Sequence, residues 1–351
     1  MNLKIQEVPM TTTEQILTLA GALGVSGGED GAVEAARQML APLGACERAP
    51  LGSLLCRIKP VPASGEHVML TAHIDSVGMI VTYIDDGGFL RVSNVGGIDR
   101  ALLLAAQVVV HTAKGELPGV VCTVPPHLNS DDTHLPKIED ISIDVGLSAE
   151  EARERIAPGD RVTFCCEARE LMNGRISTRA ADDRAGCAAV ILAAEKLAER
   201  ELSCGLSVAL TTLEEVGGQG AATAANILSP THAVAVDVSF GHAPDCPRAK
   251  CGEMGGGPMV GVAPVIDNGM SSRLREVAVR ENIPFQIEVM GGSTGTDVDG
   301  IAVSGAGVRC ALVSIPQRYM HTPVEVVHVS DVEATAELIA AYVADAFGGV
   351  R

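Results

Sequence analysis

The chain has 351 residues, of which 47% are hydrophobic, 20% charged and only 2% aromatic, and its formal net charge is -18. This apolar content excludes a disordered chain, and the glycines do not recur at every third position as in collagen. The length exceeds one typical compact domain, so we expect two lobes. The charge argues against partners such as nucleic acid or an anionic membrane, because both would be repelled.

The N-terminal part favours two amphipathic helices, at 12–23 and 32–40, where apolar residues recur at helical spacing. The first residues lack the basic stretch and apolar block of a signal peptide, and no apolar run is long enough to span a membrane. The ten cysteines form no CxxC pair and mostly lie in apolar stretches. We therefore expect a cytoplasmic protein with reduced, buried cysteines.

The middle and the C-terminal half differ in pattern. From residue 67 to about 164, short strands alternate with Asp-Gly and Lys-Gly turns, which favours a small all-β unit. After about residue 173, strands at 206–213, 233–238, 285–289 and 308–315 alternate with helices at 184–199 and 220–228. A last helix is expected to open with a capping box formed by Ser330 and Glu333. The pattern predicts an α/β fold with a mixed, largely parallel sheet flanked by helices, interrupted by the β unit.

Several polar side chains lie where predicted strands end. His73 and Asp75 end an apolar strand and share one face, so the carboxylate could hold the imidazole while its other nitrogen binds a metal. A purely structural hydrogen bond by His73 is the alternative. Asp182 and Asp183 precede the long helix, where they either cap it or supply a carboxylate that bridges two cations.

Glu214 and Glu215 follow the next strand, before Gly-Gly, so that one could bind a metal while the other handles a proton. Asp237 and His321 lie at or beyond further strand ends. Together these nitrogen and oxygen donors, with no thiolate, suit paired zinc, cobalt or manganese ions. Thr296 is a candidate for the substrate cleft.

The motifs AHID, ADDR, EEVG, VDV and RYMHTPVE occur in this order, accompanied by VGGIDR (95–100), PPHL (125–128), IDVG (143–146) and STGTD (293–297). This ordered series resembles the tetrahedral aminopeptidases, a family of co-catalytic metallopeptidases that includes glutamyl and deblocking aminopeptidases. Some of its members have been labelled endoglucanases. The resemblance extends over nearly the whole chain.

The resemblance implies two divalent metal ions. One would be bound by His73, Asp182 and Asp237, and the other by Asp182, Glu215 and His321. Glu214 would be the general base that activates a water between the metals, Asp75 would hold His73, and the Asp182–Asp183 peptide bond would be cis. The implied reaction removes N-terminal residues from peptides.

The resemblance also implies the domain organisation. Residues 1–75 and 163–351 would form a discontinuous catalytic domain, and residues 76–162 an inserted, barrel-like β domain for dimerisation. Relatives build homo-oligomers from dimers, up to hollow dodecamers, which admit peptides.

Other functions stay open at this point. Arg318 beside His321 could bind a substrate carboxylate, as in a bimetal deacylase or carboxypeptidase, although RYMH also fits the aminopeptidase pattern. Asp297 either lines the cleft with Thr296 or caps a helix. A non-catalytic peptide-binding assembly protein is a third hypothesis. The preferred N-terminal residue and the native metal do not follow from the sequence.

Overall fold

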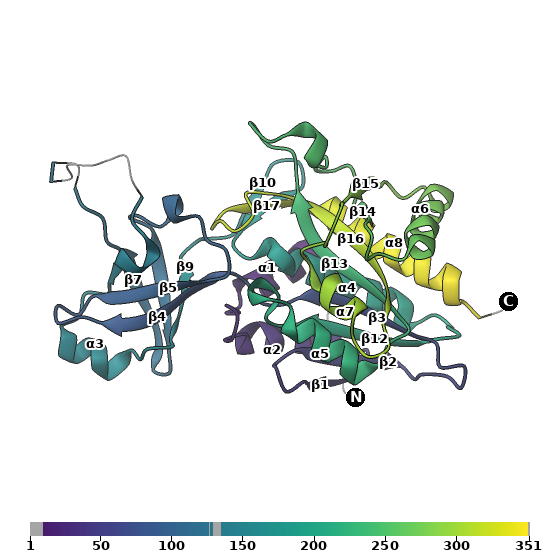
Figure 1. The fold of residues 1–351 in the computed structure, drawn as a ribbon, viewed down its shortest axis with the longest axis horizontal. Coiled ribbons are helices and arrows are strands. Elements are labelled where there is room, and N and C mark those ends of the chain that lie inside the picture. The colour runs from purple at the N-terminus through teal and green to yellow at the C-terminus, as the bar shows by residue number, and fades with distance from the viewer. Residues whose placement is uncertain (1–9, 126, 129–134, 350–351) are drawn as a thin grey trace, which may run out of the picture.

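The computed structural model describes residues 10–125, 127–128 and 135–349. It has two parts, an α/β lobe and a β barrel, arranged along the long axis of the molecule (Figure 1). Residues 1–9 at the N-terminus and Pro126 of the PPHL motif lie outside the described residues.

The α/β lobe is built on one mixed sheet. Its strands are β1 (Ala45–Arg48), β2 (Leu54–Lys59), β3 (His67–His73), β10 (Arg169–Leu171), β11 (Arg175–Thr178), β12 (Gly205–Thr211), β13 (His232–Phe240), β14 (Met259–Val262), β15 (Gln286–Val289), β16 (Arg309–Arg318) and β17 (Glu325–His328). The order is β1-β2-β12-β3-β13-β16-β17-β11-β10, with β14 paired to both β15 and β16. The central strands β12, β3, β13 and β16 are parallel. Parallel neighbours place their carboxyl ends at one edge of the sheet, where the candidate site lies.

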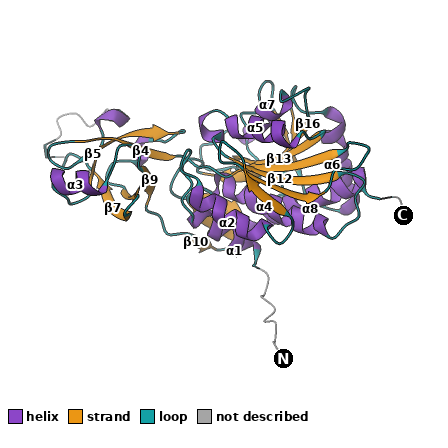
Figure 2. Cartoon of the chain, turned by 90° about the horizontal axis from the view of Figure 1, so that it is seen from below, coloured by secondary structure: helices purple, strands orange, loops and turns teal. Residues whose placement is uncertain are grey.

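Helices cover both faces of this sheet (Figure 2). Val68 and Leu70 of β3 face one helical layer, whereas Met69 between them belongs to the core on the other side. The first layer contains α1 (Thr12–Gly21), α2 (Asp30–Leu40), α4 (Ala181–Ala198), α6 (Asn268–Glu281) and α8 (Val329–Phe347), and the second contains α5 (Gln219–Leu228) and α7 (Asp297–Ala302). Because both faces of the central strands are covered, these strands are buried along almost their whole length.

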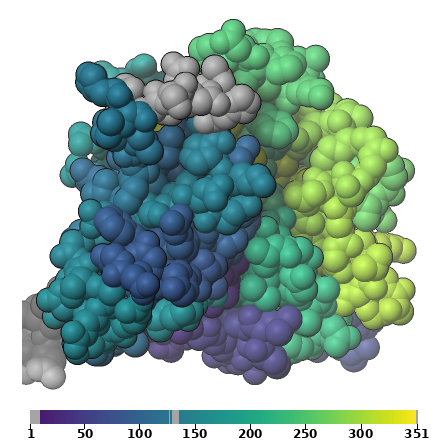
Figure 3. All heavy atoms as spheres, turned by 60° about the vertical axis from the view of Figure 1, so that its left-hand side comes forward, coloured from purple at the N-terminus to yellow at the C-terminus, as the bar shows by residue number. Residues whose placement is uncertain are grey.

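The barrel is inserted between β3 and β10. Its strands close in the order β4-β5-β8-β7-β6-β9 and are β4 (Gly78–Ile84), β5 (Leu90–Val95), β6 (Gln107–Thr112), β7 (Gly115–Val121), β8 (Ser142–Asp144) and β9 (Arg161–Phe164), with α3 (Ala149–Arg155) packed beside them. It has a hydrophobic core of its own. Figure 3, seen from the barrel side, shows the blue and teal barrel in front of the green and yellow lobe. Arg161 links the two parts through hydrogen bonds to the carbonyls of Ser26 (3.2 Å) and Gly27 (2.9 Å).

The predicted fold class is confirmed, and two details of the pattern are corrected. The strand that begins at His67 has the alternation of the β unit but belongs to the central sheet as β3. The last helix begins two residues earlier than the predicted capping box requires, and it is capped by His328, whose Nδ1 accepts the N–H of Ser330 at 3.2 Å. Glu333 bonds to Thr12 of α1 and forms no capping box with Ser330.

The expectation about the cysteines is wrong in part. β1 and β2 pair antiparallel with Cys46 opposite Cys56, and the two form a disulfide. Their ten-residue separation carries no CxxC pattern, so only the strand register reveals the pair. Cys165 and Cys246 are exposed, whereas Cys187, Cys204 and Cys310 are buried as expected. Within the described ranges, no helix has the length and apolar character needed to cross a membrane.

Leu70 gives a measurable test of this layered core, because its side chain is fully buried between β3 and the helices. We expect Leu70→Ala to lower the free energy of unfolding by about 2–5 kcal/mol, through lost burial and a residual cavity. Leu171→Ala is the matched control, because Leu171 is 44% exposed on the short strand β10, and should cost about 1 kcal/mol or less. Denaturant titration of both variants measures the difference, and equal losses would contradict the layer assignment.

Candidate metal centre

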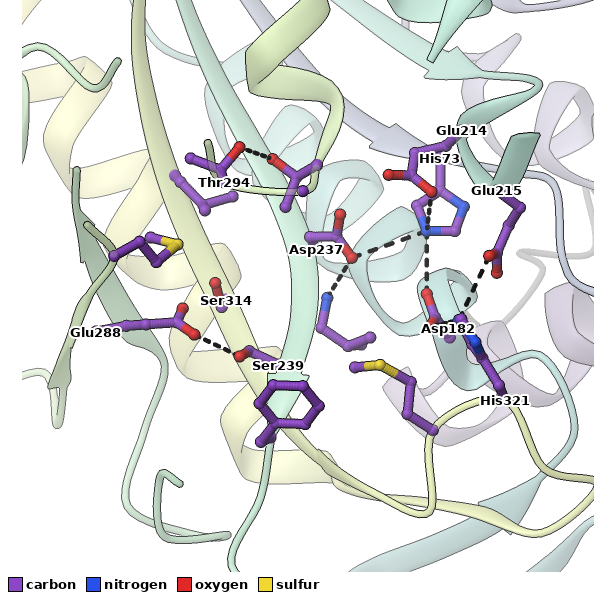
Figure 4. Close-up of a pocket in the computed structure, with 17 residues that line it drawn as sticks. His73, Asp182, Glu214, Glu215, Asp237, Ser239, Glu288, Thr294, Ser314 and His321 are labelled. Carbon is purple, nitrogen blue, oxygen red and sulfur yellow. Dashed lines mark hydrogen bonds and ion pairs between the residues drawn. The ribbon is translucent and has the colours of Figure 1, made fainter. Parts of the chain in front are cut away.

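The sequence-predicted cluster comes together at the carboxyl ends of the central strands. His73 is the last residue of β3, Glu214 and Glu215 form a 3-10 turn after β12, and Asp237 lies in β13. Asp182 lies at the start of α4, and His321 follows β16. All six line one cavity of about 430 Å³ (Figure 4). The residues that sequence reasoning drew from five separate motifs therefore share one site.

Asp182 is the centre of this arrangement. Its Oδ1 lies 3.0 Å from Nε2 of His73, and its Oδ2 lies 3.3 Å from Nε2 of His321. His321 in turn lies 3.3 Å from Oε2 of Glu215. On the other side, Nε2 of His73 lies 3.8 Å from Oδ1 of Asp237. One carboxylate thus separates two sets of donors.

Asp75 lies next to this centre and contacts both His73 and the turn that follows β12. Its carboxylate lies 3.6 Å from Nδ1 of His73, and its main-chain carbonyl lies 3.2 Å from the same nitrogen. The carboxylate also accepts the hydroxyl of Ser26 at 2.7 Å and the backbone N–H groups of Glu214 (3.1 Å) and Glu215 (3.3 Å). Asp75 therefore fixes both the imidazole of His73 and the turn that carries the two glutamates.

The backbone at these positions has unusual conformations. The Asp182–Asp183 peptide bond is cis, as the resemblance implied. Leu213 and His321 have left-handed φ angles of 64° and 61°, which are uncommon outside glycine. Gly217, with a φ of 134°, closes the turn that bears the two glutamates. Such conformations concentrate at functional sites, where the surrounding structure holds them.

Two further acidic residues complete the surroundings of the site, and the first makes a helix-capping contact of the kind that the sequence predicted. Asp183 is fully buried and accepts the N–H of Gly186 at 3.0 Å inside α4. Glu325, the last residue of RYMHTPVE, accepts the backbone N–H groups of Asp182 (3.0 Å) and His321 (2.9 Å). Sequence reasoning gave Glu325 no role. Its position in the motif was a hint, but only the fold shows that it joins two distant segments.

The charges in the site are poorly balanced without a cation. Burial raises the pKa of Glu215 to about 8, and the charge of Asp182 adds to this shift. Burial also raises the pKa of Asp237 well above its ordinary value. Burial would raise the pKa of Asp182 too, but its hydrogen bonds to His321 and His73 keep it below the ordinary value. The site therefore holds more carboxylates than its two imidazoles can compensate.

The donor set fits divalent cations. Ligand atoms of His73, Asp182 and Glu215 lie within 4.8 Å of one another, and so do those of His73, Asp183 and Asp237. In the described part of the chain, Oε1 of Glu215 and Oδ2 of Asp183 are buried without a hydrogen-bond partner. Buried polar atoms are normally paired, so these free oxygens indicate room for a positive ligand.

The predicted cleft residues have different places. Thr296 lines the cavity and caps α7, with its hydroxyl 2.9 Å from that of Thr294. Asp297 is buried in the first turn of α7, where it accepts the hydroxyl of Thr211, and Arg318 donates Nε–H to the carbonyl of His242 at 2.6 Å. Neither Asp297 nor Arg318 is among the described residues that line the cavity.

Comparison with known proteins identifies the family of this chain. The sequence profile of the M42 glutamyl aminopeptidases matches residues 52–338. The chain belongs to the M42 family. The resemblance drawn from the motifs is thereby confirmed, and this M42 chain is a metal-dependent aminopeptidase, a hydrolase that acts on peptide bonds.

Individual relatives of the M42 chain match over most of its length. A lysyl aminopeptidase from Pyrococcus furiosus is 35% identical over 295 residues, or 82% of this chain and 83% of the relative. Two solved structures are similar over nearly the whole fold. An aminopeptidase from Desulfurococcus kamchatkensis has a TM-score of 0.88 at 30% identity, covering 96% and 95% of the two chains. The Pyrococcus horikoshii TET1 peptidase, which assembles into a tetrahedron or a large octahedral shell, has a TM-score of 0.85 at 31% identity, covering 94% and 98%.

Asp297 predicts a pH effect on the metal-free M42 chain. Burial raises the pKa of Asp297 from 3.8 to about 7, so the folded chain keeps a proton that the unfolded chain releases between about pH 4 and 7. Stability due to this group therefore falls as pH rises through that interval. This loss should be absent in Asp297→Asn. As the pH rises from 4 to 8, the free energy of unfolding of the variant should therefore increase by on the order of 4 kcal/mol relative to that of the parent.

Unfolding titrations of chelated protein at several pH values measure this gain. Asp86→Asn is the control, because the Asp86 side chain is 98% exposed and its loss should leave the pH profile unchanged. A parallel pH profile for Asp297→Asn and its parent would show that Asp297 does not bind the extra proton.

Proposed function

We propose that the chain is a dinuclear aminopeptidase that removes N-terminal residues from peptides. The observation that carries this proposal is the carboxylate of Asp182, whose two oxygens face His73 on one side and His321 on the other. His73, Asp182 and Asp237 would hold one divalent ion. Asp182, Glu215 and His321 would hold the second. A shared carboxylate between two donor sets is typical of two-metal hydrolases.

The donors suit zinc, cobalt or manganese, because nitrogen and carboxylate oxygen ligands accept each of these ions. When bound, two such ions supply a more acidic water, a polarised scissile carbonyl and an anchor for the free amine of the substrate. The protein's own part is to hold the donors in place. Asp75 does so through His73, and Glu325 through the backbone of Asp182 and His321.

Glu214 is the proposed general base. Its Oε2 lies 4.0 Å from Nε2 of His73, at the wall of the cavity, and burial raises its pKa. Glu214 would take the proton of the attacking water and pass it to the nitrogen of the leaving peptide. Its neighbour Glu215 points to His321 (Figure 4), so the two glutamates have separate tasks.

The cavity favours recognition of an amine over recognition of a carboxylate. A deacylase or carboxypeptidase needs a cation for the substrate carboxylate, and the described residues that line the cavity include no lysine or arginine. Arg318, the candidate for that task, is engaged with the carbonyl of His242. A free N-terminal amine needs no such cationic side chain, because the proposed ions would anchor it.

The chain is also proposed to form a homo-oligomer. The TET1 peptidase of P. horikoshii, which covers 94% of this chain, assembles into a tetrahedron or an octahedral shell. The inserted barrel would serve as the dimerisation domain of residues 76–162, and dimers would be the building blocks, up to a dodecamer. Two statements remain predictions from the sequence: the enzyme acts on peptides, and it does so in the cytoplasm.

Replacement of the proposed base tests the mechanism. Glu214→Gln should keep both metal ions but lose about 100-fold to 10,000-fold in kcat, because the proton acceptor is gone while the ligands remain. Metal analysis and hydrolysis of aminoacyl-p-nitroanilides measure the two properties. Glu199→Gln, at an exposed residue that ends α4, is the control. Near-normal hydrolysis by Glu214→Gln would assign the base to another residue.

Glu325 provides a test that does not depend on turnover. Glu325→Gln places an amide where the carboxylate accepted two N–H groups, so Asp182 and His321 should be less well positioned. We expect metal affinity to fall roughly 10-fold to 100-fold, as for other residues that support metal ligands. Competition with a chelator measures it, and Glu337→Gln, at a half-exposed residue of α8, is the control. Unchanged affinity would limit Glu325 to a structural role.

A further inference from the structure

The cavity continues past the proposed metal centre to another carboxylate, that of Glu288 on β15. Ser239 lies two residues after Asp237 in β13, so both side chains project from the same face, about 7 Å apart along the strand. The hydroxyl of Ser239 donates to Oε1 of Glu288. Figure 4 shows Glu288 and Ser239 on one side of the cavity, with Asp237 between them and His73. Glu288 is therefore separated from the centre by about the reach of a long side chain.

The second oxygen of Glu288 has no partner. Oε2 is buried and makes no hydrogen bond within the described chain, and no ion pair of the described residues involves Glu288. The cavity lining supplies no lysine or arginine to neutralise it. Two divalent ions would offset the four carboxylates of Asp182, Glu214, Glu215 and Asp237. Glu288 then remains as an uncompensated negative charge at the far side of the cavity.

The wall between the metal centre and Glu288 is largely apolar. Met290 and Leu312 line it, and Phe240 and Met320 line the same cavity. The hydroxyls of Thr294 and Ser314 add polar points without charge. An apolar passage that ends in a carboxylate matches a side chain with an aliphatic stem and a cationic head, such as lysine or arginine.

We infer that Glu288 selects the first residue of the peptide and makes the enzyme prefer N-terminal lysine or arginine. The inference rests on the proposed function, since it takes the scissile bond to lie at the Asp182 centre. A lysine ammonium would pair with the free Oε2 of Glu288 while its methylene groups cover Met290 and Leu312. An acidic side chain would be repelled, and an aliphatic one would leave the carboxylate desolvated and unpaired.

The experiment compares lysyl-p-nitroanilide with norleucyl-p-nitroanilide, because norleucine keeps most of the aliphatic stem and lacks the ammonium. The parent enzyme, loaded with metal, should show a higher kcat/KM for lysine. Glu288→Gln should lower the lysine-to-norleucine ratio of kcat/KM by roughly 10-fold to 100-fold, the value of one charge-assisted hydrogen bond. Most of the change should be in KM, because the contact is remote from the bond that breaks.

Glu281→Gln is the matched control. It removes the same charge from an exposed position at the end of α6, outside this cavity, and should keep the ratio of the parent. Glu288→Arg should go further and favour glutamyl-p-nitroanilide over lysyl-p-nitroanilide. Binding is measured separately by calorimetry of Lys-Ala and norleucyl-Ala on the Glu214→Gln variant, where Lys-Ala should bind more tightly and the added Glu288→Gln should remove the difference.

The outcomes separate this inference from the proposed function. Hydrolysis that favours norleucine in the parent, or a ratio that Glu288→Gln leaves unchanged, would overturn the role of Glu288 and leave the aminopeptidase intact. The absence of metal-dependent hydrolysis of every substrate would instead overturn the proposed function. If Glu288→Gln fails to fold, the inference is still tested by the lysine-to-norleucine ratio of kcat/KM in the parent and by the substrate preference of Glu288→Arg.

Discussion

The carboxylate of Asp182 lies between two imidazole rings, and the rest of the site depends on this arrangement. Its oxygens face His73 at 3.0 Å and His321 at 3.3 Å. Asp182 is almost fully buried, so it needs positive partners on both sides to remain ionised. The chain satisfies this need by bringing β3 and the segment after β16 to the start of α4. Segments far apart in the sequence are thus required to meet at one point.

The parallel order of the central strands makes this meeting possible. β3, β13 and β12 end at the same edge of the sheet, so the side chains at or just beyond their ends converge without long loops. Two acidic side chains next to this edge accept the supporting hydrogen bonds. Asp75 holds the turn after β12, and Glu325 holds the backbone of Asp182 and His321. Each acidic side chain therefore fixes two segments at once, and the donors are preorganised.

Sequence reasoning named the residues that the fold brings together as proposed donors, but not all of the residues that support them. His73, Asp182, Glu215, Asp237 and His321 were found because strand ends and ordered motifs mark them locally. Glu325 was missed because its contact with Asp182 spans 143 residues of sequence, which no local pattern reveals. The disulfide between Cys46 and Cys56 was missed for the same reason, since it depends on strand register. The strand that begins at His67 resembled the β unit, yet burial on both faces assigns it to the central sheet.

The site divides its tasks between the centre and the edge of the sheet. The proposed metal donors come from the central strands and the start of α4, where both faces are packed and substitutions are costly. Glu288 comes from β15, which pairs only with β14 among the described strands and exposes Ile287 and Val289 on either side of it. Replacement of a residue on such a strand is expected to disturb the Asp182 centre less than replacement in the central strands. The fold therefore allows the preference for the first residue of the peptide to change while the chemistry of the bond stays the same.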